Sequence, residues 1–352
     1  MTSSSILFQN ASKTVVLLDL PRTIEEAQML SSDLRNNADP SRRLVSVEAP
    51  ILSFATPEPK ASRASSAPPA AQVADLMTAA AAESALAEIT TSRPGGPWHL
   101  PRITSHAPLS PAPTDNSTPD SFYRPPDSHY LHGSIASQRD TLLASVTPSF
   151  FDLILLDPPW PNRSAKRKRG AYHPVPDFSS LSDLLSLVPV ASHLAPGGLV
   201  AVWVTNSPRA VETLTAPRDG IFARWDVELV GEWTWLKVTA AGEPIIALDA
   251  TWRRPWERLL IARKRGGSGG CLPGKVIVSV PDVHSRKPCL RSLFEELLPD
   301  KYEALEVFAR SLTAGWWSWG DEVSLFQARE HWVERRDEAD PVIAAHTDDN
   351  DT

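Results

Sequence analysis

Cysteine and long apolar runs are both scarce in this 352-residue sequence, and each absence excludes a class of protein. Two cysteines, Cys271 and Cys289, make neither a disulfide framework nor a metal-ligand pattern. We therefore expect two unpaired thiols, no metal and a reducing compartment. No apolar stretch approaches the roughly 18 residues of a membrane-spanning helix, and the first residues lack the pattern of a secretory signal. The sequence predicts a soluble, intracellular protein with no membrane partner.

A surplus of basic residues is missing as well. The chain has 35 Lys and Arg against 42 Asp and Glu, a net charge of -7. Proteins that bind phosphates usually show a basic surface, which the total charge does not indicate. The total conceals local differences, because residues 163–169 and 253–265 are basic whereas residues 334–351 are acidic.

Proline and tryptophan, in contrast, are abundant and unevenly distributed. Many of the 33 prolines lie between Pro57 and Pro126 among Ala, Ser and Thr, and all 12 tryptophans except Trp98 lie at position 160 or later. A core requires large apolar side chains. Residues 70–89 could form an Ala-rich helix, but they carry too few large apolar residues to bury one face of it. The prediction is a small ordered segment packed on the core (1–50), a disordered low-complexity linker (51–127), a folded domain (128–335) and a flexible acidic tail (336–352).

The second half of the sequence shows the hydrophobic pattern of an α/β fold. Residues 151–156 and 199–204 are continuous apolar runs, typical of strands buried on both faces. Helical spacing over 182–194 ends at Pro196-Gly197-Gly198. Strands alternating with helices favour a largely parallel sheet. Further strands are expected at 14–18, 225–237, 259–262, 275–280 and 305–308, and further helices at 207–214 and 290–298.

The sequence Asp157-Pro158-Pro159-Trp160 directly follows the first of these buried strands. In open α/β sheets, ligands bind beyond the carboxyl ends of the strands. Two consecutive prolines form a stiff segment that cannot pair as a strand, which leaves their carbonyl groups as hydrogen-bond acceptors. Asp157 adds a carboxylate, and Trp160 adds a broad aromatic face. Rigid acceptors beside a stacking surface suit a flat ligand with an exocyclic amine; a strand-ending turn with a buried tryptophan is the alternative.

Leu155-Leu156-Asp157-Pro158-Pro159-Trp160 resembles the signature of the MT-A70-like adenine-N6 methyltransferases, and the chain is most similar to the branch called methyltransferase-like protein four. The resemblance covers roughly residues 150–330 and includes separate blocks in the family's order. These blocks are Trp203-Val204-Thr205-Asn206, residues 232–239 with Gly242-Glu243, Arg254-Pro255-Trp256-Glu257, residues 278–281, His284-Ser285-Arg286-Lys287-Pro288, Phe308-Ala309-Arg310 and residues 315–320.

The resemblance implies a Rossmann-like fold that uses S-adenosyl-L-methionine, with the Asp157-Pro158-Pro159-Trp160 block preceding the cofactor-binding strand. The chain has no Gly-x-Gly-x-x-Gly motif, so the cofactor is inferred from the resemblance alone. The implied reaction is methyl transfer to the N6 amine of adenine in RNA, such as small nuclear RNA, or in DNA. The resemblance further implies a nuclear or cytoplasmic enzyme that acts as a monomer or with a protein partner.

Residue roles carry over from the same resemblance. Asp157, Pro158, Pro159 and Trp160 would form the catalytic block, in which Asp157 and the Pro158 carbonyl accept the two N6 hydrogens of an adenine swung out of its stack. The chain departs from the family at Asp321, where an amide is usual; this puts ribose affinity in doubt. The cofactor-binding residues would be Asp157, Lys287, Phe308, Arg310, Asp321 and Glu322.

The resemblance also implies residues that bind the substrate. Lys237 and Glu257 resemble pocket residues near the base. The loop after the catalytic block resembles the family's target-gripping loop, with Lys166, Arg167, Lys168 and Arg169 placed to neutralise phosphates and Tyr172 to stack. Structural alternatives remain open: a solvated or nuclear-import loop for the basic run, exposed charges for Lys237, Glu257, Lys287 and Arg310, and an ordinary core position for Phe308.

Two alternative functions remain open at the level of sequence. The first is a catalytically weak member that binds RNA or supports a partner subunit, although such members typically lose the intact Asp-Pro-Pro-Trp block. The second is a related methyltransferase that acts on another amine, such as cytosine N4 or glutamine. Trp160 and the distal blocks favour adenine.

Overall fold

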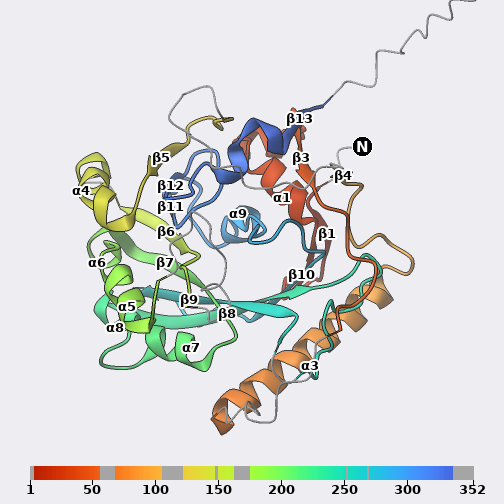
Figure 1. Ribbon diagram of the computed structural model, residues 1–352, viewed down its shortest axis with the longest axis horizontal. Coiled ribbons are helices and arrows are strands. Elements are labelled where there is room, and N and C mark those ends of the chain that lie inside the picture. The colour runs from red at the N-terminus through yellow and green to blue at the C-terminus, as the bar shows by residue number, and fades with distance from the viewer. Residues whose placement is uncertain are drawn as a thin grey trace, which may run out of the picture.

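A ten-stranded mixed sheet forms the centre of the computed structural model, which describes residues 4–55, 68–104, 122–146, 150–161, 175–250, 253–267 and 269–335 (Figure 1). Its strand order is β1-β2-β10-β8-β9-β7-β6-β11-β12-β5. Most neighbouring pairs are parallel; β1 with β2, and β9 with both β8 and β7, are antiparallel. The strands are β1 (Ile6–Gln9), β2 (Val15–Leu18), β5 (His129–His132), β6 (Phe151–Leu156), β7 (Leu194–Val204), β8 (Val227–Lys237), β9 (Trp256–Lys264), β10 (Lys275–Ser279), β11 (Ala304–Val307) and β12 (Trp317–Gly320).

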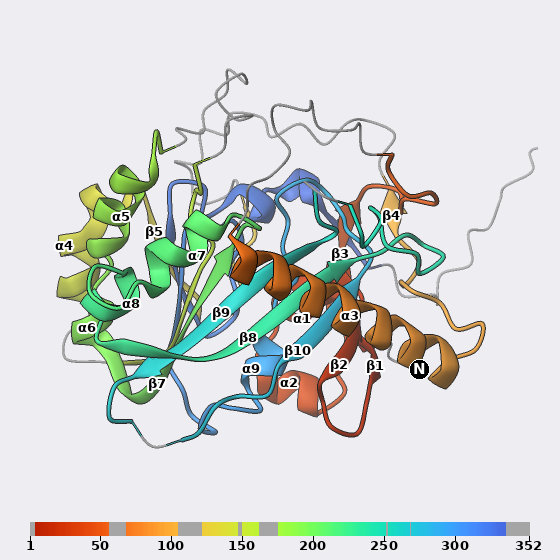
Figure 2. The same ribbon diagram turned by 90° about the horizontal axis from the view of Figure 1, so that it is seen from below.

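Helices cover both faces of this sheet, which confirms the predicted α/β class. Alternate residues of the strands face two separate cores, so Ile154 packs on one side and Leu155 on the other. One core is covered by α4 (Ile135–Val146), α5 (Phe178–Ser186), α6 (Val190–His193), α7 (Pro208–Thr215) and α8 (Ile221–Arg224), which gather at one side of Figures 1 and 2. The opposite core is covered by α1 (Leu20–Glu26) and α9 (Arg291–Phe294).

Two predicted helices differ in extent from those observed. The single helix expected at 182–194 is two helices, α5 and α6, because Pro189 lacks the N–H that a continuous helix needs. The side chain of Asp177 starts α5 earlier than predicted by accepting a bond from the Ser180 backbone N–H at 2.8 Å. Pro196 lies within β7 and follows the helix-to-strand junction. The helix expected at 290–298 is confined to α9.

Helix α3 (Pro69–Ser92) corrects the prediction of a disordered linker over 51–127. It runs across the sheet near β8 and β10 (Figure 2). The prediction assumed that a packed helix must itself carry large apolar residues. Here the strands beneath the helix carry them instead. Small side chains let the helix approach closely, and Ala82, Ala85 and Ile89 are buried against Leu17, Val278 and their neighbours. Alanine also has the highest helix propensity. Residues 56–67 and 105–121 of that predicted linker, like the predicted tail at 336–352, lie outside the described residues.

The N-terminal segment is part of the main sheet, where the sequence predicted a peripheral element packed on it. Strand β2 lies between β1 and β10, and pairs in parallel with β10 from Val15 to Leu18. A second sheet joins this segment to the end of the domain, in the order β13-β3-β4. The remaining elements are α2 (Ser31–Arg35), β3 (Arg42–Ser46), β4 (Ile103–Thr104), β13 (Trp332–Glu334) and the 3-10 turns Leu325–Gln327 and Arg329–His331.

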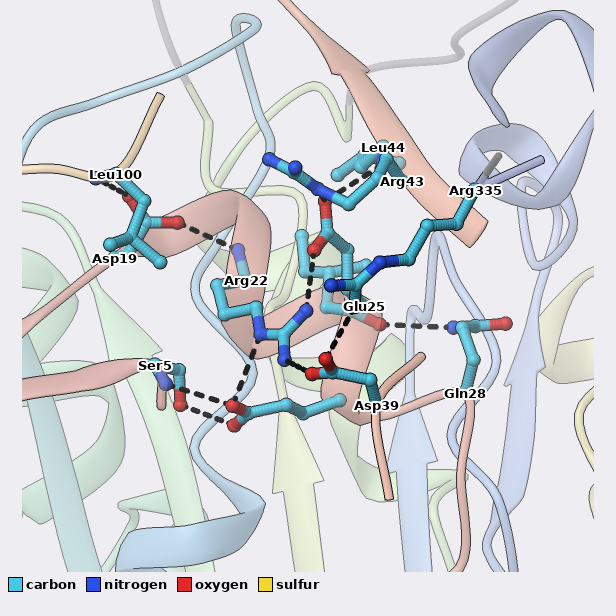
Figure 3. A network of polar contacts seen from close by, with 12 residues as sticks. Ser5, Asp19, Arg22, Glu25, Gln28, Asp39, Arg43, Leu44, Leu100 and Arg335 are labelled. Atoms are coloured by element: carbon cyan, nitrogen blue, oxygen red, sulfur yellow. Dashed lines mark hydrogen bonds and ion pairs between the residues drawn. The ribbon is translucent and has the colours of Figure 1, made fainter. Parts of the chain in front are cut away.

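A buried network of charged residues fixes α1 in place (Figure 3). Arg22, whose side chain is 8% exposed, contacts Glu25 at 3.4 Å and Asp39 at 2.5 Å. Glu25 also accepts bonds from the side chain of Arg43 and the backbone N–H of Leu44, both at 2.9 Å. These contacts connect α1 to β3, so the helix is held at one position over the sheet.

The carboxyl ends of the central parallel strands meet at one edge of the sheet. Strands β6, β10, β11 and β12 end there, and the antiparallel β9 begins there, next to the end of β8. This is the edge at which open α/β sheets bind ligands. Among the described residues, no helix is both long and apolar enough to span a bilayer.

Candidate active site

Asp157 lies at the centre of this edge, one residue beyond β6. Its backbone N–H donates to Val307 on the neighbouring strand at 3.4 Å. Its Oδ2 atom accepts bonds from Lys287 Nζ at 3.0 Å and from Arg310 Nη1 at 3.3 Å. No described residue donates a hydrogen bond to Oδ1. The carboxylate is therefore held by two cations through one oxygen, and the other oxygen is available as an acceptor.

A chain of alternating charges extends from Asp157 toward β8. Lys287 Nζ also contacts Glu257 at 3.2 Å, and Glu257 in turn pairs with Lys237. Burial raises the pKa of the Glu257 carboxyl, but Lys287 and Lys237 outweigh burial and hold this pKa at about 2. Burial lowers the pKa of Lys287, and Asp157 and Glu257 more than reverse this, so its pKa is raised. Glu257 and Lys287 are therefore both ionised at neutral pH.

A buried ion pair fixes the position of the loop that carries Lys287. Arg286 contacts Asp282 at 2.5 Å, and both side chains are 0% exposed. The same guanidinium donates to the Val45 carbonyl of β3 at 3.0 Å. Because Val45 belongs to the N-terminal segment, that segment helps to set the position of Lys287.

Trp160 is anchored at the other side of Asp157. Its indole N–H donates to the Trp203 carbonyl at 2.7 Å, and its ring lies 6.3 Å from that of Phe178. Its backbone N–H donates to the Pro158 carbonyl at 2.8 Å. The Pro158 carbonyl is thus engaged within the motif, where the sequence predicted a free acceptor, although a carbonyl oxygen can accept a second bond.

Phe308 and Arg310 follow β11 and face the same site. Phe308 has φ of 62°, a left-handed conformation that is strained for a bulky residue and is found most often at functional sites. Arg310 bridges two carboxylates, since its Nε donates to Glu322 at 2.9 Å while Nη1 reaches Asp157. Asp321 is exposed, and its backbone carbonyl contacts His132 at 2.9 Å.

Asp157, Lys287, Phe308 and Arg310 line one cavity at this edge of the sheet. Leu155 and Trp316 supply apolar walls, and Ile24 of α1 closes one side. Charged atoms concentrate at one end of the cavity, where Asp157, Lys287 and Arg310 meet. The chemistry of this lining therefore suits a ligand that combines a flat or apolar part with a zwitterionic end.

The structure brings most of the predicted site residues together. Lys237, Glu257, Lys287, Arg310 and Glu322 form one connected set of ion pairs with Asp157, rather than separate exposed charges. Asp321 is exposed and is not among the residues that line the cavity. The predicted phosphate-contacting loop lies outside the described residues, with Lys166, Arg167, Lys168, Arg169 and Tyr172.

The pocket residues that the sequence did not identify as such include Ile24, Trp203 and Glu306. Ile24 lies in a segment that the sequence placed outside the domain, so no local pattern connects it to the site. Trp203 belongs to a block named in the resemblance, but without a role. Glu306 gave a usable signal, because an acidic residue inside the apolar run Leu305 to Phe308 breaks the pattern of a buried strand.

Comparison with known proteins identifies the family. Residues 151–322 match the MT-A70 family. The chain is 52% identical over 334 residues to "N6-methyladenosine RNA methyltransferase MTA1" of Cryphonectria parasitica, covering 94% of each chain. It is 45% identical over 368 residues to the protein of the same name from Pyricularia oryzae, covering 94% of this chain and 97% of that one. It is 35% identical over 225 residues to human "N(6)-adenine-specific methyltransferase METTL4", covering 60% of this chain and 45% of the human protein. The chain belongs to the MT-A70 family of adenine-N6 methyltransferases.

Proposed function

We propose that the protein transfers a methyl group from S-adenosyl-L-methionine to the N6 amine of adenine in RNA. The observation that carries the proposal is the geometry around Asp157. One oxygen of this carboxylate is held by two cations, the other is available at the cavity, and the anchored Trp160 lies three residues further along the chain. Membership in a family of S-adenosylmethionine-dependent enzymes supports the same reaction.

The residues of the cavity fit the cofactor that this family uses. S-adenosylmethionine supplies a methyl group carried on a positively charged sulfur. Its carboxylate matches Lys287, a half-buried ammonium that lines the cavity. Its ribose hydroxyls match the acceptor oxygens of Glu322 and Asp321 near Arg310. Asp157, Lys287, Phe308 and Arg310 of the predicted cofactor set line the cavity, and Glu322, which follows Asp321, pairs with Arg310. On this basis we propose cofactor-binding roles for all six.

Asp157 and Trp160 would hold the target base. Asp157 accepts a hydrogen from the N6 amine, which turns the nitrogen lone pair out of conjugation with the ring, and the Pro158 carbonyl accepts the second hydrogen with its remaining lone pair. Trp160 stacks on the base, a contact worth about 1–3 kcal/mol and comparable to the cost of unstacking. Lys287 and Arg310 fix the orientation of Asp157, so rate enhancement arises mainly from positioning.

RNA is the proposed substrate because two relatives that match nearly the whole chain are named as RNA methyltransferases. Lys237 and Glu257 lie at the edge of the site next to Lys287 and are proposed to border the base. The loop with Lys166, Arg167, Lys168, Arg169 and Tyr172 is proposed, from its basic sequence, to contact the RNA backbone.

The proposal is tested by methyl transfer from tritiated S-adenosylmethionine to RNA and DNA oligonucleotides of the same sequence. We expect N6-methyladenosine on RNA after nucleoside analysis, and a loss of about 100-fold or more in rate for Asp157→Asn, because an amide has only one acceptor oxygen and presents an N–H to the amine or to a cation. Asp140→Asn makes the same change in a side chain that is 97% exposed, and should retain full activity.

Three outcomes would contradict the proposal. An Asp157→Asn variant as fast as the unaltered protein would remove the assigned role of the carboxylate. Methylated cytosine as the product would place the chain among the other amine methyltransferases. Preferential methylation of the DNA strand would overturn the choice of RNA.

A further inference from the structure

A second cavity lies at the opposite edge of the sheet from the candidate active site. Its lining includes the start of β10, where Lys275 is in register with Trp233 of β8. Ser279, at the other end of β10, is in register with Lys237 at the active-site edge. The two cavities have no lining residue in common. The proposed methyl transfer therefore assigns no role to the second cavity.

The walls of this second cavity are largely apolar, and its charged groups include one cation more than anions. Trp233 and Leu293 supply large apolar side chains. Lys13 and Glu296 form an ion pair at 2.9 Å, so these two charges compensate each other. The remaining charged residue of the lining is Lys275.

Lys275 is a buried cation without an anion beside it. The residue is 7% exposed. Among the described residues, no carboxylate lies within ion-pair distance of its ammonium, which instead lies 5.1 Å from the centre of the Trp233 ring. Burial lowers the pKa of Lys275, Glu296 reverses this only in part, and Lys13 lowers the pKa further. A buried ammonium costs free energy unless an anion compensates it or it loses its proton.

We propose that the second cavity binds a small organic monocarboxylate, with its carboxylate at the Lys275 ammonium and its apolar body against Trp233 and Leu293. One surplus positive charge matches one negative charge, whereas a phosphate dianion would bring a second negative charge toward Glu296. The apolar walls favour an anion that has an apolar body over an inorganic ion. The volume of the cavity is about 230 Å³, below the roughly 300–1,000 Å³ of sites for drug-sized ligands, so the acid must be small.

Benzoate is the probe for this site, because it joins one carboxylate to a flat apolar ring. Benzamide has nearly the same shape without the charge, and inorganic phosphate has charge without the apolar body. Ligand-observed NMR measures the dissociation constant of each compound. Lys275→Met removes the charge and keeps an apolar chain, and Lys301→Met makes the same change at an exposed residue. The samples contain neither methyl donor nor RNA, so the outcome is independent of the proposed function.

We expect benzoate to bind the unaltered protein with a dissociation constant of about 1 mM or lower. Lys275→Met should bind it about 10-fold or more weakly, the scale of a lost hydrogen bond to a charged group. Benzamide and phosphate should each bind the unaltered protein about 10-fold or more weakly than benzoate, because one lacks the charge and the other the apolar surface. Lys301→Met should behave as the unaltered protein.

A measurement on the unaltered protein covers the case in which Lys275→Met does not fold, which thermal unfolding would reveal. Acetic anhydride acetylates the neutral form of an amine, and mass spectrometry of peptides gives the rate at each lysine. A saturating concentration of benzoate should slow the acetylation of Lys275 several-fold, because the carboxylate covers the amine and favours its charged form. Acetylation of Lys301 should not change.

Four outcomes would overturn the proposal. Lys275→Met could bind benzoate as tightly as the unaltered protein does, or benzoate could leave the acetylation of Lys275 unchanged. Benzamide could bind as tightly as benzoate, which would mean that the ammonium does not select an anion. Phosphate could bind as tightly as benzoate, which would mean that the apolar walls contribute nothing.

Discussion

Buried charged residues in this protein act in sets, and Arg22 shows what one such residue contributes. Its guanidinium lies between Glu25, Glu26 and Asp39, and its side chain is only 8% exposed (Figure 3). Removing one member of a buried set leaves the remaining buried charges without a counter-charge. The stability lost is then far larger than the contribution of an exposed ion pair.

We expect Arg22→Met to reduce the free energy of unfolding by about 3 kcal/mol, because Glu25 is 1% exposed and loses a cation that it cannot replace with water. The measurement is equilibrium denaturation in urea. Arg42→Met is the matched control, since Arg42 pairs with Glu334 at side-chain exposures of 33% and 63%, and should lose at most about 1 kcal/mol. Equal losses in the two variants would show that the network does not stabilise α1.

At the scale of single residues, the sequence predicted the motif of the active site better than the contacts that hold it in place. The Asp157 motif follows a run that any buried strand would show, so both its position and its chemistry could be inferred. The ion pairs that link Asp157 to Lys287 and Arg310 join residues more than 100 positions apart. Their partners could be inferred only from a resemblance, because no local pattern determines which cation reaches which carboxylate.

Elements packed through small residues are harder to infer than those with apolar runs. Helix α3 was assigned to a disordered linker because alanine faces such as Ala82 and Ala85 carry little hydrophobic signal, although an Ala-rich helix was a possibility there. Strands β6 and β7 were predicted because their runs of Leu, Ile and Val are buried on both faces. The segment after α3 returns to the sheet through Trp98, which packs under the turn between β8 and β9.

A substitution at Gly242 in that turn tests whether the segment after α3 packs on the sheet through Trp98. A Cβ atom there would lie 2.1 Å from the indole of Trp98, at a φ of +85°. We expect Gly242→Ala to lose about 1 kcal/mol from the left-handed backbone and about 1–3 kcal/mol more from overpacking, measured by urea denaturation. Gly266→Ala isolates the first cost, because Gly266 has φ of +72° and no atom within 4 Å of the added carbon.

A similar loss in both glycine variants would mean that Trp98 does not pack on the turn in solution. Indole fluorescence provides a second measurement, because displacing Trp98 exposes a half-buried ring to water. We expect a shift to longer wavelength in Gly242→Ala and none in Gly266→Ala.

For the molecule as a whole, the residues that match the family do not form a complete folding unit. The match begins at residue 151, whereas β2 and β5 lie before it. Strand β10 lies between β8 and β2, and its residue Ile277 belongs to the same core as Val16. Helix α1 places Ile24 against the cavity. The sequence predicted domain boundaries where the composition changes. In the structure, residues on both sides of these boundaries pack into the same hydrophobic core.

A fragment of residues 122–335 should therefore fail to fold, although it contains the whole family match. Without the N-terminal segment, β10 has an unpaired edge, and apolar residues such as Leu293 and Phe294 lose the packing of Val16 and Leu18. We expect a broad thermal transition and strong binding of a hydrophobic dye. A fragment of residues 1–335 keeps every described element, and it should unfold as sharply as the full chain. If residues 122–335 instead unfold cooperatively at the temperature of the full chain, the N-terminal segment is an appendage, as its composition first suggested, and the contribution of α1 to the cavity is dispensable.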